Sequence, residues 1–255
     1  MRIQAIQNAL ATAKKVFLRT VTSDKPSDRV GFYLDRICVE EFNEILLLAG
    51  NGSDVGALKV LRGMVERAVT SAYILQNPDE AGRFLDYHKA HKHKAYNHAK
   101  KLGQFGPRLS AETIKQIEDD FEAVKATYSD EVCHACGKTR LMGSWTKLDT
   151  ASMAHRVGKG YDDIYYNAFY RPTLQVHTTV ASLMARLEIN ADGRMTFKCA
   201  AQRDEAGHAV LLAHNLLLRV LDSQNRHFAH GLEGELEKNV QDFQKAYGRE
   251  GAPNQ

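Results

Sequence analysis

Arg171 and His177, an arginine and a histidine separated by five residues, form the pair in this sequence best suited to phosphodiester chemistry. The guanidinium group carries a permanent charge and binds phosphate oxygens, and the imidazole accepts or donates a proton near neutral pH. On a regular helix the two side chains lie roughly 120° apart around the axis and about 9 Å apart along it. The pair therefore converges only if Arg171 lies outside the helix or a second chain contributes. The structural alternative places Arg171 in a surface ion pair and makes His177 a hydrogen-bonded core residue.

A cationic segment from His88 to Lys101 carries four histidines and five lysines. Lysines at this density are suited to contact the phosphates of a nucleic acid, and a solvated helix face is the alternative explanation. The candidate nucleic-acid-binding residues are Lys89, Lys92, Lys94, Lys100 and Lys101.

Cys133 and Cys136 have the spacing of one half of a zinc site. The sequence has no second pair of this kind, so the remaining ligands would come from His134, His155 or the distant cysteines. A pair of reduced thiols is the simpler interpretation, and we expect neither a metal nor another cofactor.

The composition is that of a globular protein, since 44% of the 255 residues are hydrophobic and 25% are charged. The net charge of +3 is too small to establish nucleic-acid binding by itself. The N-terminal segment mixes Gln, Asn and Lys with its apolar residues, unlike a signal peptide, and no apolar run approaches the roughly 18 to 20 residues of a membrane span. We therefore expect a cytoplasmic protein without a membrane partner.

Apolar residues recur at helical steps of three and four almost throughout the chain, and the prolines fall where helices begin or end. These patterns predict a single all-α domain over residues 1–255, a helical bundle of about eight to ten helices. The expected helices cover about 2–20, 29–49, 54–76, 78–102, 110–128, 149–157, 161–169, 172–186, 201–223 and 230–246. A small β-hairpin is expected near 187–198, and the stretch of about 130–147 is expected to be irregular. The core should come from the second, third and fourth helices and the helix at about 201–223.

A longer ordered set of residues extends from Leu61 to His177. It comprises Leu61, Arg62, Glu66, Tyr73, Asn77, Pro78, Asp79, Glu80, Arg83, Phe84, Ser144, Trp145, Met153, Ala154, Gly158, Tyr166, Tyr170, Arg171, Pro172, Thr173 and His177. This set resembles a bacterial all-helical family known only as a domain of unknown function, over about residues 30–225. Thr173 stands where the family pattern has a serine, which keeps the hydroxyl group. The resemblance implies a polar cluster inside the bundle, formed by Arg62, Glu66 and the later tyrosine, hydroxyl and histidine residues.

Arg62 and Glu66 lie four residues apart and so share one helix face, among the apolar residues Leu61, Met64 and Val65. An exposed pair at this spacing stabilises a helix by only about 0.2–0.5 kcal/mol. We expect the pair to be buried, in which case the loss of Glu66 leaves an uncompensated charge and costs more than roughly 2 kcal/mol.

The arginine-to-histidine spacing also resembles that of the HEPN superfamily, helical bundles whose dimers cleave RNA with an arginine and a histidine separated by roughly four to six residues. Pro172 departs from the polar residue usual directly after that arginine. The resemblance implies a metal-independent ribonuclease or RNA-binding protein of the toxin or phage-defence type, with RNA as partner and a homodimer as assembly. His177 would be the general acid or base and Arg171 would hold the phosphate, with support from Arg62, Glu66, Tyr170 and Thr173.

Two alternatives stay open from the sequence. One is a non-catalytic helical interaction module in which Arg62, Glu66 and His177 form a buried polar network. The other is a zinc-binding protein that uses Cys133 and Cys136. A solvent-open site at His177 favours chemistry, whereas full burial with every polar atom satisfied favours the network.

Overall fold

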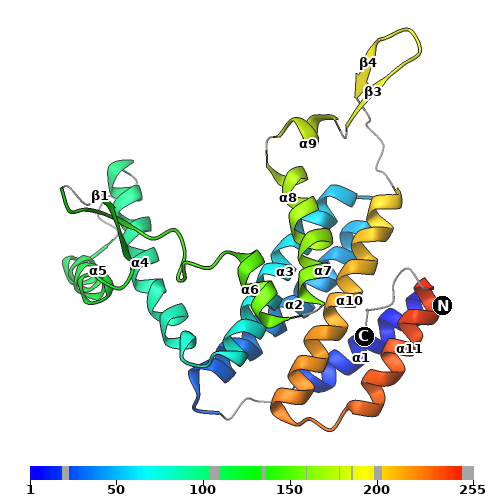
Figure 1. The fold of residues 1–255 in the computed structure, drawn as a ribbon, viewed down its shortest axis with the longest axis horizontal. Coiled ribbons are helices and arrows are strands. Elements are labelled where there is room, and N and C mark those ends of the chain that lie inside the picture. The colour runs from blue at the N-terminus through cyan, green and yellow to red at the C-terminus, as the bar shows by residue number, and fades with distance from the viewer. Residues whose placement is uncertain are drawn as a thin grey trace. The chain divides into compact units, whose positions relative to one another are not determined.

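The computed structural model describes residues 1–18, 23–103, 109–133, 136–158, 160–177, 179–184, 186–197 and 203–248. Most of these residues are helical, and within them strands occur only as two small antiparallel hairpins (Figure 1). The predicted all-α class is therefore confirmed. The chain forms two compact units, one made of Met1–Gln76 with Thr150–Gln255 and one made of Asn77–Asp149.

The larger unit contains most of the helices. They are α1 (Arg2–Phe17), α2 (Pro26–Gly50), α3 (Asp54–Gln76), α6 (Thr150–Val157), α7 (Tyr161–Ile164), the π-helix η1 (Tyr165–Tyr170), α8 (Arg171–Val176), α9 (Val180–Met184), α10 (Arg203–Phe228) and α11 (Glu233–Tyr247). The strands β3 (Leu187–Ile189) and β4 (Met195–Phe197) lie between α9 and α10.

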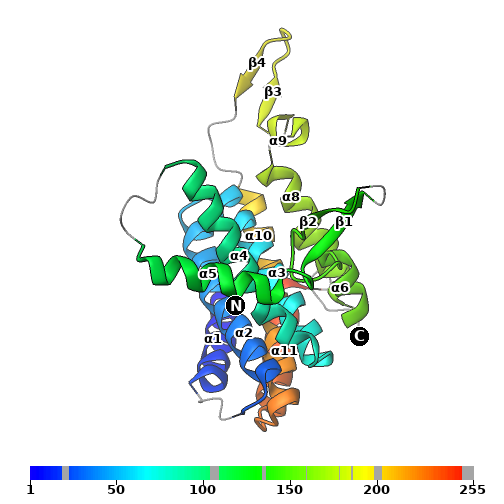
Figure 2. The same cartoon turned by 90° about the vertical axis from the view of Figure 1, so that its left-hand side faces the viewer.

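The core of the larger unit lies where α2, α3 and α10 pack side by side (Figure 1 and Figure 2). Phe42 and Ile45 on α2, Leu61 on α3, and Leu217 and Leu221 on α10 are fully buried. On α2 and α10 these residues follow the spacing of three or four that brings side chains to one helix face. Complete burial of each such side chain contributes roughly 1.5–3 kcal/mol, so this three-helix contact is a main source of the unit's stability.

The smaller unit consists of α4 (Glu80–Lys101), α5 (Ala111–Val124), β1 (Ser129–Cys133) and β2 (Lys138–Leu141). Its core is formed by Ala90, Phe121, Val124 and Tyr128. Ser110 caps α5 as its sequence predicts, because its hydroxyl accepts a hydrogen bond from the backbone N–H three residues later at 3.1 Å.

Two expectations fail in this unit. α4 belongs to the smaller unit and not to the main core, because it buries only Ala81, Ala90 and Tyr96 and so lacks the broad apolar face of a central helix. β1 and β2 pair as a hairpin where an irregular segment was expected. Their residues are mostly polar and give no alternating apolar pattern from which strands are predicted.

The hairpin predicted near 187–198 is confirmed by β3 and β4. Leu187 pairs with Phe197 and Ile189 with Met195, so the four apolar side chains share one face of the hairpin. Gly193 lies in the turn with a φ of +79°, a backbone conformation that residues other than glycine rarely adopt. All of these residues except Leu187 are exposed, so the hairpin presents an apolar face to solvent.

Candidate functional site

The segment that carries Arg171 is continuous helical backbone with an unusually wide turn. α7 leads into the π-helical residues of η1, and the N–H of Arg171 donates to the carbonyl oxygen of Tyr166, five residues earlier. Pro172 follows, and a proline has no N–H and clashes with the carbonyl four residues before it. A wider turn moves that carbonyl away and admits Pro172 without breaking the helix. Such π-helical turns are frequently found at functional sites.

Arg62 on α3 holds the wide turn in place. Its Nε–H donates to the hydroxyl of Thr173 at 2.9 Å, and this hydroxyl donates to the carbonyl oxygen of Phe169 at 2.6 Å. The guanidinium carbon lies 4.6 Å from the centre of the Phe169 ring, which is cation–π distance. The structure thus brings together two predicted supporting residues, Arg62 and Thr173, as a positioning contact between α3 and α8.

Glu66 lies at the edge of this contact. Its Oε2 is 3.9 Å from Nη1 of Arg62, and the Glu66 and Arg62 side chains are 52% and 28% exposed. The prediction of a buried pair was wrong, because Glu66 is offset around α3 from the buried stripe through Leu61, Met64 and Val65. A solvent-exposed ion pair contributes about 0–1 kcal/mol.

The outer face of η1 is aromatic. Tyr166 and Tyr170, four residues apart, stack with ring centres 5.8 Å apart and an interplanar angle of 19°. They are 57% and 45% exposed. Arg171, the next residue, is also exposed, and no ion pair engages its side chain within the described residues. A flat aromatic surface beside a guanidinium group is suited to stack a nucleobase and hold its phosphate.

His177 lies just beyond the C-terminal end of α8. Its backbone is extended, with φ −82° and ψ 153°, and its side chain is exposed. The core-histidine alternative was therefore wrong, and so was the buried network of Arg62, Glu66 and His177. Arg171 has helical φ and ψ of −60° and −49°, so it does not lie outside the helix as convergence within one chain requires.

The predicted lysines lie on α4 of the smaller unit. Lys89 pairs with Asp86 at 2.8 Å, and the ammonium of Lys100 lies 5.6 Å from the centre of the Tyr96 ring. The remaining lysines of the set, Lys92, Lys94 and Lys101, are exposed.

The cysteine pair lies at the β1–β2 hairpin. Cys133 ends β1 and Cys136 is an exposed free thiol, whereas His134 falls outside the described residues. His155, another candidate ligand, belongs to the larger unit, and its Nδ1 lies 3.4 Å from Oδ2 of Asp162. In the described part of the chain no group of three or more metal-ligating side chains comes together.

Sequence reasoning missed a buried carboxyl group, Asp35, at the contact of α2, α3 and α10. Gln224 Nε2 donates to Asp35 Oδ2 at 2.7 Å, and Ser71 also hydrogen-bonds to this carboxyl group. Burial raises the pKa of Asp35 to about 7, against the opposing effect of these hydrogen bonds. The available signal was its place in the apolar stripe of α2, between Phe32 and Cys38, where a charged residue is out of pattern.

A second carboxyl group with a raised pKa, Glu41, lies on the same helix. Its Oε1 accepts a hydrogen bond from Arg67 Nη1 at 2.6 Å. Burial raises the pKa of Glu41 to about 7, although the charge of Arg67 acts in the opposite direction. Both carboxyl groups are enclosed by helices, so they bear on the pH dependence of stability.

These features define an all-α protein whose candidate site is an exposed aromatic and cationic helix face. Residues 28–195 match a family of unknown function (DUF5677), and the chain belongs to this family. The matched range contains α3, the smaller unit and the whole segment from α7 to α8. No curated protein and no solved structure matches the chain. Among the described residues, none of the helices combines the length and the apolar character that a membrane span requires.

Proposed function

We propose that the protein binds single-stranded RNA on the face formed by η1 and α8 and cleaves it without a metal ion. The exposed stack of Tyr166 and Tyr170 directly beside Arg171 carries this proposal. Stacking of a base on an aromatic side chain contributes about 1–3 kcal/mol and tolerates any base, because every base has a π-face. Arg171 then holds the phosphate next to the stacked base.

Cleavage adds the proton chemistry of His177. The imidazole of one copy removes the proton from a 2′-hydroxyl, the 2′ oxygen bonds to the adjacent phosphorus, and the bond from phosphorus to the 5′ oxygen breaks. A protonated imidazole from the other copy supplies the proton to the leaving oxygen. The products are a 2′,3′-cyclic phosphate and a 5′-hydroxyl end. Arg171 stabilises the negative charge that develops on the phosphate.

A homodimer is part of this proposal. Arg171 lies within helical backbone and His177 lies beyond the end of α8, and in this proposal the arginine of one copy acts with the histidine of the other. The similarity to the HEPN superfamily supports the same assembly and chemistry. The exposed lysines of α4 offer a separate phosphate-binding surface on the smaller unit. The bacterial cytoplasm is the compartment in which such a protein meets RNA.

RNA binding is tested by fluorescence anisotropy with a labelled single-stranded RNA of mixed sequence in the presence of EDTA. We expect Tyr170→Ala to weaken binding about fivefold or more, as the loss of one stacking contact implies. Arg171→Gln should weaken binding and also reduce its dependence on salt. Arg156→Gln removes another exposed arginine, on α6, and should leave the affinity unchanged. The binding proposal fails if the parent has no affinity or if both Tyr170→Ala and Arg171→Gln bind like it.

Cleavage is tested separately with His177→Ala. This variant should bind RNA like the parent but produce no 2′,3′-cyclic phosphate ends. If the parent leaves the RNA intact over the same incubation, cleavage is refuted and the binding proposal stands on its own.

A non-catalytic interaction module is the second candidate function, because the segment α9–β3–β4 exposes many apolar side chains. The exposed residues include Val180, Leu183 and Met184 on α9 and Ile189 and Phe197 on the hairpin. Exposed apolar side chains that gather on one segment are typical of protein-binding sites. In this case the parent binds no RNA, and Ile189→Ser abolishes a self-association that sedimentation velocity detects in the parent.

A further inference from the structure

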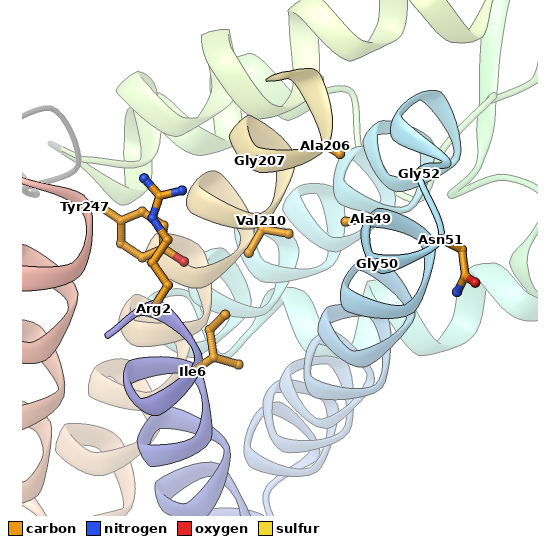
Figure 3. A pocket seen from close by; sticks show the side chains of 10 residues that line it. All are labelled: Arg2, Ile6, Ala49, Gly50, Asn51, Gly52, Ala206, Gly207, Val210 and Tyr247. Carbon is orange, nitrogen blue, oxygen red and sulfur yellow. The ribbon is translucent and has the colours of Figure 1, made fainter. Parts of the chain in front are cut away.

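A pocket of about 760 Å³ lies at one end of the larger unit, and none of the residues that line it belongs to the proposed RNA face. The start of α1, the end of α2, the start of α10 and the end of α11 form its walls (Figure 3). This volume is within the range of about 300–1,000 Å³ that is typical of small-molecule sites.

Most of the wall is apolar and built from small residues. Ile6, Ala49 and Val210 contribute apolar side chains, and Gly50 and Gly207 lie beside them. A methyl group placed on either glycine would meet no atom within 4 Å, so the space beside both is open. The pocket can therefore take an apolar body without a movement of the helices.

Two polar side chains stand out in this wall, Arg2 and Tyr247. The guanidinium carbon of Arg2 lies 5.2 Å from the centre of the Tyr247 ring, and Arg2 Nε donates to the carbonyl oxygen of Ala246 at 3.3 Å. No carboxylate whose side chain the structure describes pairs with Arg2, so its other N–H groups are available to a ligand. Figure 3 shows the guanidinium group beside the tyrosine ring and the tyrosine oxygen on the side toward Val210.

The hydroxyl of Tyr247 is buried and has no hydrogen-bond partner among the described residues. A buried hydroxyl without a partner is destabilising, and a ligand oxygen that accepts its hydrogen bond would relieve this cost. Burial raises the pKa of Tyr247, although Arg2 acts in the opposite direction, so the hydroxyl keeps its proton and acts as a donor. A cation and a neutral donor side by side match the two oxygens of a carboxylate.

We propose that this pocket binds a small apolar carboxylic acid, with an alkyl or aromatic body against Ile6, Ala49 and Val210. Its carboxylate accepts hydrogen bonds from Arg2 and from the Tyr247 hydroxyl. The inference is independent of RNA binding, since it uses none of the residues of the η1–α8 face.

Displacement of the fluorescent probe 8-anilinonaphthalene-1-sulfonate by octanoate and by 1-octanol tests the proposal. These competitors have the same alkyl chain, so their difference reports the recognition of the charge. For the parent we expect octanoate to displace the probe at a concentration about tenfold or more below that of 1-octanol, as a charge-assisted hydrogen bond implies.

Three variants locate the site. Arg2→Gln should remove the preference for octanoate over 1-octanol. Gly207→Leu should fill the pocket, so neither octanoate nor 1-octanol should displace the fluorescent probe from this variant. Arg29→Gln, an exposed arginine on α2, is the matched control and should behave like the parent. Thermal melting of each variant confirms that it folds, which keeps probe binding to an unfolded chain out of the comparison. Equal displacement by both competitors in the parent, or unchanged binding in a folded Gly207→Leu protein, overturns the proposal.

Discussion

Asp35→Asn should make the protein more stable at pH 8 while leaving its stability near pH 4 almost unchanged. Asp35 is buried, and its pKa in the folded protein is about 7, compared with an ordinary value of 3.8. Between pH 3.8 and about pH 7 the carboxyl group of Asp35 has lost its proton in the unfolded chain, whereas the folded protein retains this proton. The folded state then binds more protons, so the free energy of unfolding falls as the pH rises through this window.

The magnitude follows from the two pKa values. A tenfold change in an equilibrium corresponds to about 1.4 kcal/mol, so the interval from 3.8 to about 7 corresponds to about 4 kcal/mol lost by pH 8. Asparagine is neutral at every pH and has nearly the same shape. Its amide oxygen still accepts the hydrogen bond from Gln224. We therefore expect Asp35→Asn to exceed the parent by up to about 4 kcal/mol at pH 8.

Urea unfolding followed by far-ultraviolet circular dichroism at pH 4, 5, 6, 7 and 8 measures this difference. The comparison with the parent cancels the contribution of other groups, including Glu41, whose pKa is also raised to about 7. Asp24→Asn changes an exposed carboxylate and is the matched control, with no change of slope expected. If Asp35→Asn differs from the parent by the same amount at pH 5 and pH 8, the folded protein does not hold the extra proton, and the reasoning is refuted.

Three further substitutions test the packing by urea unfolding at a single pH. Thr173→Val removes the hydroxyl that accepts from Arg62 and should cost about 1–3 kcal/mol; an unchanged midpoint would mean that the contact contributes nothing. Glu66→Ala should cost less than about 1 kcal/mol because the side chain is half exposed, and a loss above roughly 2 kcal/mol would restore the buried pair. Gly160→Ala should cost more than about 1 kcal/mol, since φ is +101° and the added methyl group collides with the Arg219 guanidinium; an unfolding midpoint like that of the parent would contradict this.

Local signals in the sequence were sufficient for most of the helices. α3 begins and ends at the predicted residues, Asp54 and Gln76, because Gly and Asn residues precede it and a proline follows it. Ser110 marks the start of α5 through its capping hydrogen bond. The β3–β4 turn could likewise be predicted, because Gly193 has a positive φ and glycine is the residue that adopts this conformation without strain.

The properties that depend on distant residues could not be predicted. An arginine and a glutamate four residues apart have the same spacing whether they are buried or exposed. Only the packing of η1 and α8 on α3 determines that Arg62 is partly covered while Glu66 is exposed. The same holds for Pro172, which the sequence indicates as the start of a helix. The backbone is helical on both sides of Pro172, because the wide turn and the contact with Arg62 accommodate it.

The contact of Arg62 and Thr173 also decides how the proposed RNA face can fail. Arg62 and Thr173 face Phe169 on the inner side of the turn, whereas Tyr166 and Tyr170 are exposed on its outer side. If the wide turn sets the stacking geometry, Thr173→Val weakens RNA binding without removing any group that touches RNA. Its effect and that of Tyr170→Ala are then less than additive in the double variant, because a misplaced ring has less binding energy to lose. Additive effects would mean instead that Thr173 contributes to the RNA contact on its own, and Arg62 would lose its role as the residue that positions the face.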